Sequence, residues 1–156
     1  MIRHITTSDK YKSIRNFGIL QPSICGSVLT HGYISFEKNW QSDILIAIMI
    51  HAKGWHELYR NNMIVSLEFD ELKLTNKLAN PNGLPNKNEN RVYIPVYVGG
   101  NLVTEGILSN EDFNTIGEYA FIKGSIDINI NTPKVVCHGI DNETTRNAMR
   151  NIGYDT

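Results

Sequence analysis

The sequence has little of what extracellular, membrane or metal-binding proteins depend on. Its only cysteines among 156 residues are Cys25 and Cys137, too few for a disulfide framework and without metal-ligand spacing. No apolar run approaches the roughly 20 residues that a membrane-spanning helix needs, and residues 44–50 form the longest one. The N-terminus lacks the apolar region of a signal peptide. We therefore expect a cytoplasmic protein with no membrane partner and no metal site.

The sequence also has no large excess of charge of one sign. Fifteen basic residues stand against 16 acidic ones, a net charge of −1, which argues against a generic, charge-driven nucleic-acid binder but leaves a local basic groove open. The apolar fraction of 41% is enough for one core, so a single domain over residues 1–156 is expected. The 18 asparagines and 20 isoleucines are typical of an AT-rich genome, such as that of a phage or a low-GC bacterium.

The strong catalytic motifs are absent as well. The sequence contains no P-loop, no GxGxxG, no HExxH, no paired CxxC and no GxSxG. Of the five histidines, His51 and His56 are five residues apart, whereas a shared metal site on a helix favours a spacing of three or four. We expect both side chains on the surface.

Periodicity predicts three short helices and many short strands. The helices are expected at 8–17, 44–53 and 142–151, with N-cap oxygens at 7–9, 42–43 and 141, and with Gly18, Gly54 and Gly153 behind them. Strands are expected at 1–5, 33–37, 63–69, 91–98, 101–108, 118–122, 125–130 and 134–137. Pro95 suggests an edge strand or a bulge. Because no strict βαβ alternation appears, the class is α+β with a mostly antiparallel or mixed sheet.

Two segments show no period and are expected to be loops. Residues 73–90 contain six asparagines, two prolines and one glycine, a composition typical of a mobile segment or a cover on a site. Residues 109–115 are polar and rich in turn formers, and residues 99–100 are a Gly-Gly turn signal.

The beginning of the chain resembles a known family. His-Ile-Thr at 4–6 ends the first strand, a short helix follows, and Gly-Ile-Leu comes at 18–20. This order is similar to the opening of ADP-ribosyltransferase domains, and most similar to the DarT group of nucleic-acid-modifying toxins. Related openings occur in the RNA 2′-phosphotransferases and the poly-ADP-ribose polymerases.

Two later segments resemble the family in its chain order. His-Gly-Tyr-Ile-Ser-Phe at 31–36 is similar to a strand that carries a tyrosine, and 116–126 is similar to the late strand that starts with the catalytic glutamate. The loop at 109–115 stands where the family keeps a substrate-contacting loop. The resemblance covers residues 1–126 and implies an ADP-ribosyltransferase-like fold, in which two small, mostly antiparallel sheets flanked by short helices form a cleft for NAD.

The resemblance assigns the catalytic role to Glu118. When NAD loses nicotinamide, positive charge develops on the ribose, and a carboxylate held nearby stabilises it. The ordinary alternative is an exposed glutamate at the start of a strand.

The resemblance also assigns NAD contacts. His4 would bind the adenosine ribose, because a neutral imidazole offers a donor and an acceptor. The backbone of Ile5 would hold the nicotinamide amide, and Tyr33 would stack on its ring. Thr6 either binds the same ribose or caps the helix, and Ser35 is a supporting residue of the NAD site.

Arg3 offers a competing assignment, because another branch of the superfamily uses an arginine on the first strand. Arg3 and His4 are neighbours and face opposite sides of a strand, so only one of them points into a cleft. His4, followed by Ile-Thr, fits the family pattern better.

The resulting function is mono-ADP-ribosyl transfer from NAD, used as a substrate, to a macromolecular acceptor. The protein would be a phage or bacterial conflict protein, either a toxin, an effector or an inhibitor of host defence. The chain departs from each branch of the family at one point. Position 116 is Ile, where the arginine-modifying branch has Glu or Gln, and position 44 is Ile, where the polymerases have a second stacking tyrosine. No arginine stands between Gly18 and Trp40, although the DarT toxins have one after the first helix. The acceptor, protein or nucleic acid, is therefore open, as is the oligomeric state. The alternatives are a non-catalytic binding or inhibitor module on the same fold, another transferase of the superfamily, and an NAD glycohydrolase.

Overall fold

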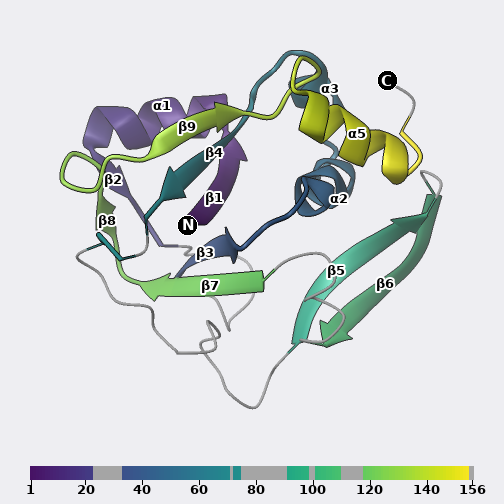
Figure 1. Ribbon diagram of the computed structural model, residues 1–156, viewed down its shortest axis with the longest axis horizontal. Coiled ribbons are helices and arrows are strands. Elements are labelled where there is room, and N and C mark those ends of the chain that lie inside the picture. The colour runs from purple at the N-terminus through teal and green to yellow at the C-terminus, as the bar shows by residue number, and fades with distance from the viewer. Residues whose placement is uncertain (23–32, 71, 75–90, 99–100, 110–117, 155–156) are drawn as a thin grey trace. The chain divides into compact units, whose positions relative to one another are not determined.

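The α+β class expected from the sequence is confirmed (Figure 1). The computed structural model describes residues 1–22, 33–70, 72–74, 91–98, 101–109 and 118–154, with the backbone alone at 33, 91–98, 101–109, 118–121 and 123. The loops expected at 73–90, 99–100 and 109–115 fall almost entirely outside the described residues.

The chain forms two compact units that interleave along the sequence. The first unit comprises Met1–Asn39, Val65–Asn90 and Glu118–Val136, and the second comprises Trp40–Ile64, Arg91–Gly117 and Cys137–Thr156. The single domain over residues 1–156 stays a prediction.

A five-stranded sheet, ordered β7-β3-β1-β4-β9, organises the first unit (Figure 1). Its strands are β1 (Ile2–Thr7), β3 (Tyr33–Lys38), β4 (Ile64–Phe69), β7 (Glu118–Lys123) and β9 (Lys134–Cys137). The central pairings are antiparallel, because β3 runs opposite to both β1 and β7. A second, two-stranded sheet pairs β2 (Ile19–Leu20) with β8 (Ile126–Asp127), also antiparallel.

Alternation along the strands produces the core of the first unit. Ile34 and Phe36 of β3 are buried together with Ile2 of β1 and Ile122 of β7 in one cluster. Each such side chain contributes about 1.5–3 kcal/mol when it leaves water. Tyr11 of the helix α1 (Ser8–Phe17) packs against this cluster, so the helix covers the core with an apolar face.

Helix α1 (Ser8–Phe17) begins and ends where the sequence predicts. The hydroxyl of Thr7 accepts a hydrogen bond from the Lys10 amide at 3.3 Å, which makes Thr7 the N-cap. Gly18 has φ +72° and donates its amide to Ile14 at 2.8 Å, closing the C-terminus in the left-handed conformation.

The second unit contains three helices and a ribbon among its described residues. They are α2 (Ile44–Lys53), α3 (His56–Arg60) and α5 (Glu143–Asn151), with the antiparallel pair β5 (Arg91–Val98) and β6 (Asn101–Ser109). Helices α2 and α5 pack side by side (Figure 1). The ribbon has a register shift between Val96 and Tyr97, next to Pro95, so the bulge that this proline suggested is present.

Three expectations need correction. Helix α3 was not expected, and only α2 and α5 were predicted in this unit. Asn142, not Asp141, caps α5, because its side chain accepts from the Thr145 amide at 3.1 Å. The strand expected at 125–130 ends after Asp127, whose carboxylate accepts from the amides of Asn129 and Ile130 and turns the chain.

Candidate functional site

A pocket of about 560 Å³ lies in the first unit, where β1 passes into α1. It is lined by His4, Thr6, Lys10, Ser13, Ile14, Phe17, Ile19, Leu20 and Gln21. The volume is in the range of small-molecule sites. None of the described residues that line it is acidic, and Lys10 contributes a positive charge. The pocket therefore suits an anionic ligand with an apolar part.

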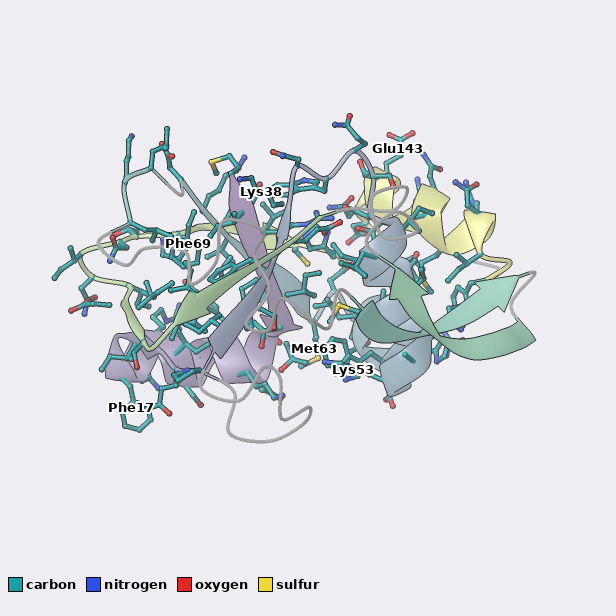
Figure 2. All side chains as sticks on the ribbon, turned by 90° about the horizontal axis from the view of Figure 1, so that it is seen from below. Phe17, Lys38, Lys53, Met63, Phe69 and Glu143 are labelled. Carbon is teal, nitrogen blue, oxygen red and sulfur yellow. The ribbon has the colours of Figure 1, made fainter. Side chains whose placement is uncertain are left out.

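The wall of this pocket is built by consecutive elements of the chain. Because Thr7 caps α1 directly after β1, the helix begins beside the strand that carries His4 and Thr6. After the cap at Gly18, β2 contributes Ile19 and Leu20 to the lining. Phe17, the last residue of α1, is 80% exposed, and its ring projects away from the helix (Figure 2).

His4 is held in one orientation by β3. Its Nδ1 donates a hydrogen bond to the carbonyl oxygen of Ser35 at 2.9 Å, since a carbonyl accepts only. The neutral ring therefore keeps its proton on Nδ1 and has an acceptor at Nε2. The His4 ring also meets the edge of Phe36, with centroids 5.9 Å apart. Ser35 thus positions His4 through its backbone.

Thr6 and Ile5 are two of the residues to which the resemblance assigns NAD contacts. The side chain of Thr6 is 4% exposed and lines the pocket. Thr7 supplies the helix cap, so the N-cap role that was weighed for Thr6 belongs to its neighbour. Ile5 is half-buried.

The strands that carry the three family-like segments are neighbours in one sheet. Lys38 of β3 pairs with Ile2 of β1 on one side and with Glu118 of β7 on the other. Position 4 follows position 2 on the same side of the pleat. Two strand spacings and two residues along β1 put the Cα positions of His4 and Glu118 about 12 Å apart.

Tyr33 has a different register position. It pairs with Lys123, and by alternation it belongs to the face opposite to positions 34, 36 and 38. The structure describes only the backbone of Tyr33 and Glu118. The expected convergence of their side chains with that of His4 stays a prediction.

The Arg3 side chain forms an ion pair on the face of β1 opposite to that of His4. Its Nε donates to Glu37 Oε2 at 2.7 Å, and the two side chains are 2% and 0% exposed. Arg3 and Glu37 are paired across β1 and β3, so this arginine forms a buried ion pair and does not line the pocket.

A second polar cluster lies in the second unit, and no pattern in the sequence predicted it. Nδ1 of His138 lies 3.3 Å from Asp43 Oδ2 and 3.1 Å from Thr145 Oγ1, and the threonine hydroxyl donates to the same carboxylate oxygen at 2.7 Å. The carboxylate and the hydroxyl both meet the same ring nitrogen, whereas a nucleophilic triad needs them on opposite nitrogens. All three side chains are buried. The cluster therefore ties α2 to α5 and has no substrate access.

The surface position predicted for His51 and His56 also needs correction. Gly54, with φ +67°, ends α2, and α3 then starts at His56. The two rings come to 4.6 Å between centroids and 3.1 Å between Nδ1 of His51 and Nε2 of His56. Both side chains are half-buried and are not the surface residues that the sequence spacing predicted.

Metal ligands and membrane spans were also sought. Within the residues that the structure describes, no group of three or more His, Cys, Asp or Glu side chains could hold a metal ion. Over the same residues, no helix is both long and apolar enough to cross a bilayer.

Comparison with known proteins gives no relative: no family model, no curated protein and no solved structure matches this chain.

Proposed function

We propose that this chain is a mono-ADP-ribosyltransferase that cleaves NAD and passes ADP-ribose to a macromolecular acceptor, protein or nucleic acid. The observation that carries the proposal is the adjacency of β1, β3 and β7. Three segments far apart in sequence, which resemble the family in their order, are neighbouring strands in space. The pocket at His4 and Thr6 lies at the same sheet.

The pocket supports binding of the adenosine part of NAD. Nε2 of the neutral His4 accepts a hydrogen bond from a ribose hydroxyl, and the buried hydroxyl of Thr6 adds a second polar group. Lys10 favours the pyrophosphate, which carries the negative charge of the ligand. The apolar side chains of Ile14 and Leu20 suit a purine ring.

The two riboses of NAD are separated by a pyrophosphate, so the side chains that bind the two riboses need not be in contact with each other. A separation of about 12 Å between the Cα positions of His4 and Glu118 is compatible with one residue at each ribose. In this proposal Glu118 stabilises the cationic nicotinamide ribose. Nicotinamide leaves with the electron pair of the C1′–N bond, and the acceptor forms a new bond to C1′ and gives up a proton.

The backbone of Ile5 would bind the nicotinamide amide. Tyr33, which the resemblance assigns to the nicotinamide ring, stands by register on the opposite face of β3 from positions 36 and 38, so it has no role in this proposal. Ser35 serves indirectly, because its carbonyl fixes the His4 tautomer. The cleft between two small sheets, which the resemblance implies, is part of the same proposal.

The test uses the purified chain with NAD labelled in its adenylate part and a bacterial lysate. Release of nicotinamide and transfer of label to macromolecules are measured, with and without nuclease or protease treatment of the product. The proposal expects both signals. Nicotinamide release without transfer would indicate a glycohydrolase, NAD binding without release a non-catalytic module, and neither binding nor release would overturn the proposal.

A further inference from the structure

Phe17 is an exposed aromatic side chain in the pocket of the first unit. It ends α1, lines the pocket and is 80% exposed, and Figure 2 shows its ring projecting beyond the helix. Ile19, two residues later, lines the same pocket and is 40% exposed. Single exposed apolar side chains are common on protein surfaces, whereas two in one pocket indicate a surface that a ligand covers.

The other apolar side chains of this pocket belong to the core. Leu20 is 2% exposed and is part of the buried cluster of the first unit, and the half-buried Ile14 packs against that cluster. Both line the pocket, but most of their surface is already covered by protein. A flat apolar group in this pocket therefore has Phe17 and Ile19 as its exposed apolar partners.

Helix α1 places a cation and the Phe17 ring toward opposite ends of one face. Four pocket residues lie on that side of the helix, because they are three, four and seven positions apart: Lys10, Ser13, Ile14 and Phe17. At about 1.5 Å of rise per residue, Lys10 and Phe17 are about 10 Å apart along the axis. Among the described residues, the Lys10 ammonium forms no ion pair, so its charge is available to a ligand.

A nucleotide carries groups that match this arrangement. Its phosphate is anionic, its base is a flat aromatic ring, and a ribose with hydroxyl groups joins the two. The faces of bases stack on aromatic side chains, and lysine binds phosphate as a point charge. His4 and Thr6 of β1 add polar groups to the same pocket, and such groups bind ribose hydroxyls.

We propose that Phe17 selects the adenine end of NAD by stacking on the purine ring, with Ile19 beside it. NAD as the ligand rests on the proposed function. The dinucleotide lies along α1, with the adenine at Phe17 and the pyrophosphate at Lys10. Since stacking uses the face of the ring, Phe17 distinguishes a nucleotide from a sugar phosphate that has no base.

The test measures the affinity of the full chain for AMP and for ribose 5-phosphate, which lacks the base, by isothermal titration calorimetry. The parent should bind AMP about 5- to 150-fold more tightly, the range expected for one base stacked on an aromatic side chain. Phe17→Ala should reduce the AMP affinity to about that for ribose 5-phosphate. Phe17→Tyr should keep the AMP affinity, because its ring is also flat, whereas Phe17→Leu, which is apolar but not flat, should not.

Ile130→Ala is the matched control, because Ile130 is an apolar side chain of the first unit that is 71% exposed and does not line this pocket. It should leave the AMP affinity unchanged. Equal AMP affinity in the parent and Phe17→Ala would overturn the role of Phe17. An equal loss of affinity for AMP and ribose 5-phosphate in Phe17→Ala would do the same, since it would mean that Phe17 shapes the whole pocket.

Nicotinamide release separates the role of Phe17 from the proposed function. Phe17→Ala should raise the KM for NAD and leave kcat near the parental value, because the adenine contact is the same in the ground state and the transition state. If Phe17→Ala cleaves NAD with the parental KM, the role of Phe17 fails and the transferase stands. If AMP binding depends on Phe17 but the parent does not cleave NAD, the transferase fails and the nucleotide contact stands.

Discussion

Arg3 and Glu37 are charged residues placed where solvent does not reach them. Their side chains are 2% and 0% exposed, and Nε meets Oε2 at 2.7 Å. Taking two charges out of water is costly, and the attraction between them mainly compensates that cost. The pair therefore specifies how β1 and β3 align more than it stabilises the fold.

Arg3→Met should lower the free energy of unfolding by about 3–5 kcal/mol, because it leaves the Glu37 carboxylate buried without this cation. The double variant Arg3→Met/Glu37→Leu should recover most of that loss, since it removes both charges. Urea unfolding of the parent and both variants measures the difference. A double variant as unstable as the single one would show that the pair is net stabilising.

His51 should make stability depend on pH. Burial lowers the pKa of His51 below its ordinary value of 6.5, and the neighbouring His56 lowers it further. The unfolded chain then binds more protons than the folded chain as pH falls through 6.5, so the free energy of unfolding decreases in that direction. The contribution of His51 to stability is complete above pH 6.5. It is lost as the pH falls from 6.5 toward the lower pKa of the folded state.

His51→Gln should flatten this dependence. Unfolding of the parent and the variant by urea at several pH values between about 5 and 8 gives the two slopes. Parallel slopes for the parent and His51→Gln would show that other groups cause the pH dependence.

At the scale of elements, two helices end on glycines in the left-handed conformation, and their surroundings differ. Gly18 has φ +72°, and a Cβ there would lie 2.5 Å from Nδ2 of Asn129. Gly54 has φ +67°, and a Cβ there would meet nothing within 4 Å. The backbone cost of adding a side chain is about 1–2 kcal/mol at either site.

Gly18→Ala should therefore destabilise the protein more than Gly54→Ala, because it adds displacement of the Asn129 amide to the backbone cost. The double variant Gly18→Ala/Asn129→Ala should lose about as much stability as Gly54→Ala. Thermal unfolding compares the three. Equal losses for the two single variants would mean that Asn129 moves aside without cost.

Glycines and capping side chains made many of these elements predictable. Gly18 and Gly54 mark helix ends because only glycine adopts positive φ cheaply. Helix α3 escaped prediction because it is five residues long and has no side-chain cap at Trp55. The strand at 125–130 was extended too far because alternation of Ile residues does not reveal that the Asp127 side chain turns the chain.

At the scale of the whole molecule, the candidate site depends on long-range pairing. The sequence placed His4, Ile5 and Thr6 on a first strand before a short helix, and that local prediction is confirmed. The pairing of β3 with β7 joins residues 80 to 90 positions apart, and its pairing with β1 joins residues 34 to 36 positions apart, which no local pattern specifies. The ring contact of His51 with Tyr154 also joins residues far apart in the sequence, so no local pattern indicated it.

Glu118 carries the central claim, and one substitution tests it. Glu118→Gln keeps the shape of the side chain and removes its negative charge, so the loss belongs mainly to the transition state. Turnover should fall about 100- to 1,000-fold, as for the removal of one preorganised electrostatic group, with little change in NAD affinity. Glu68→Gln, on β4 of the same sheet, is the matched control and should keep the parental rate.

The decisive measurement is the rate of nicotinamide release from NAD by the parent, Glu118→Gln and Glu68→Gln, with NAD affinity determined for each by calorimetry. We expect a large loss of rate in Glu118→Gln alone, while all three chains bind NAD alike. Parental turnover in Glu118→Gln would contradict the catalytic role of Glu118 and the proposed transferase mechanism.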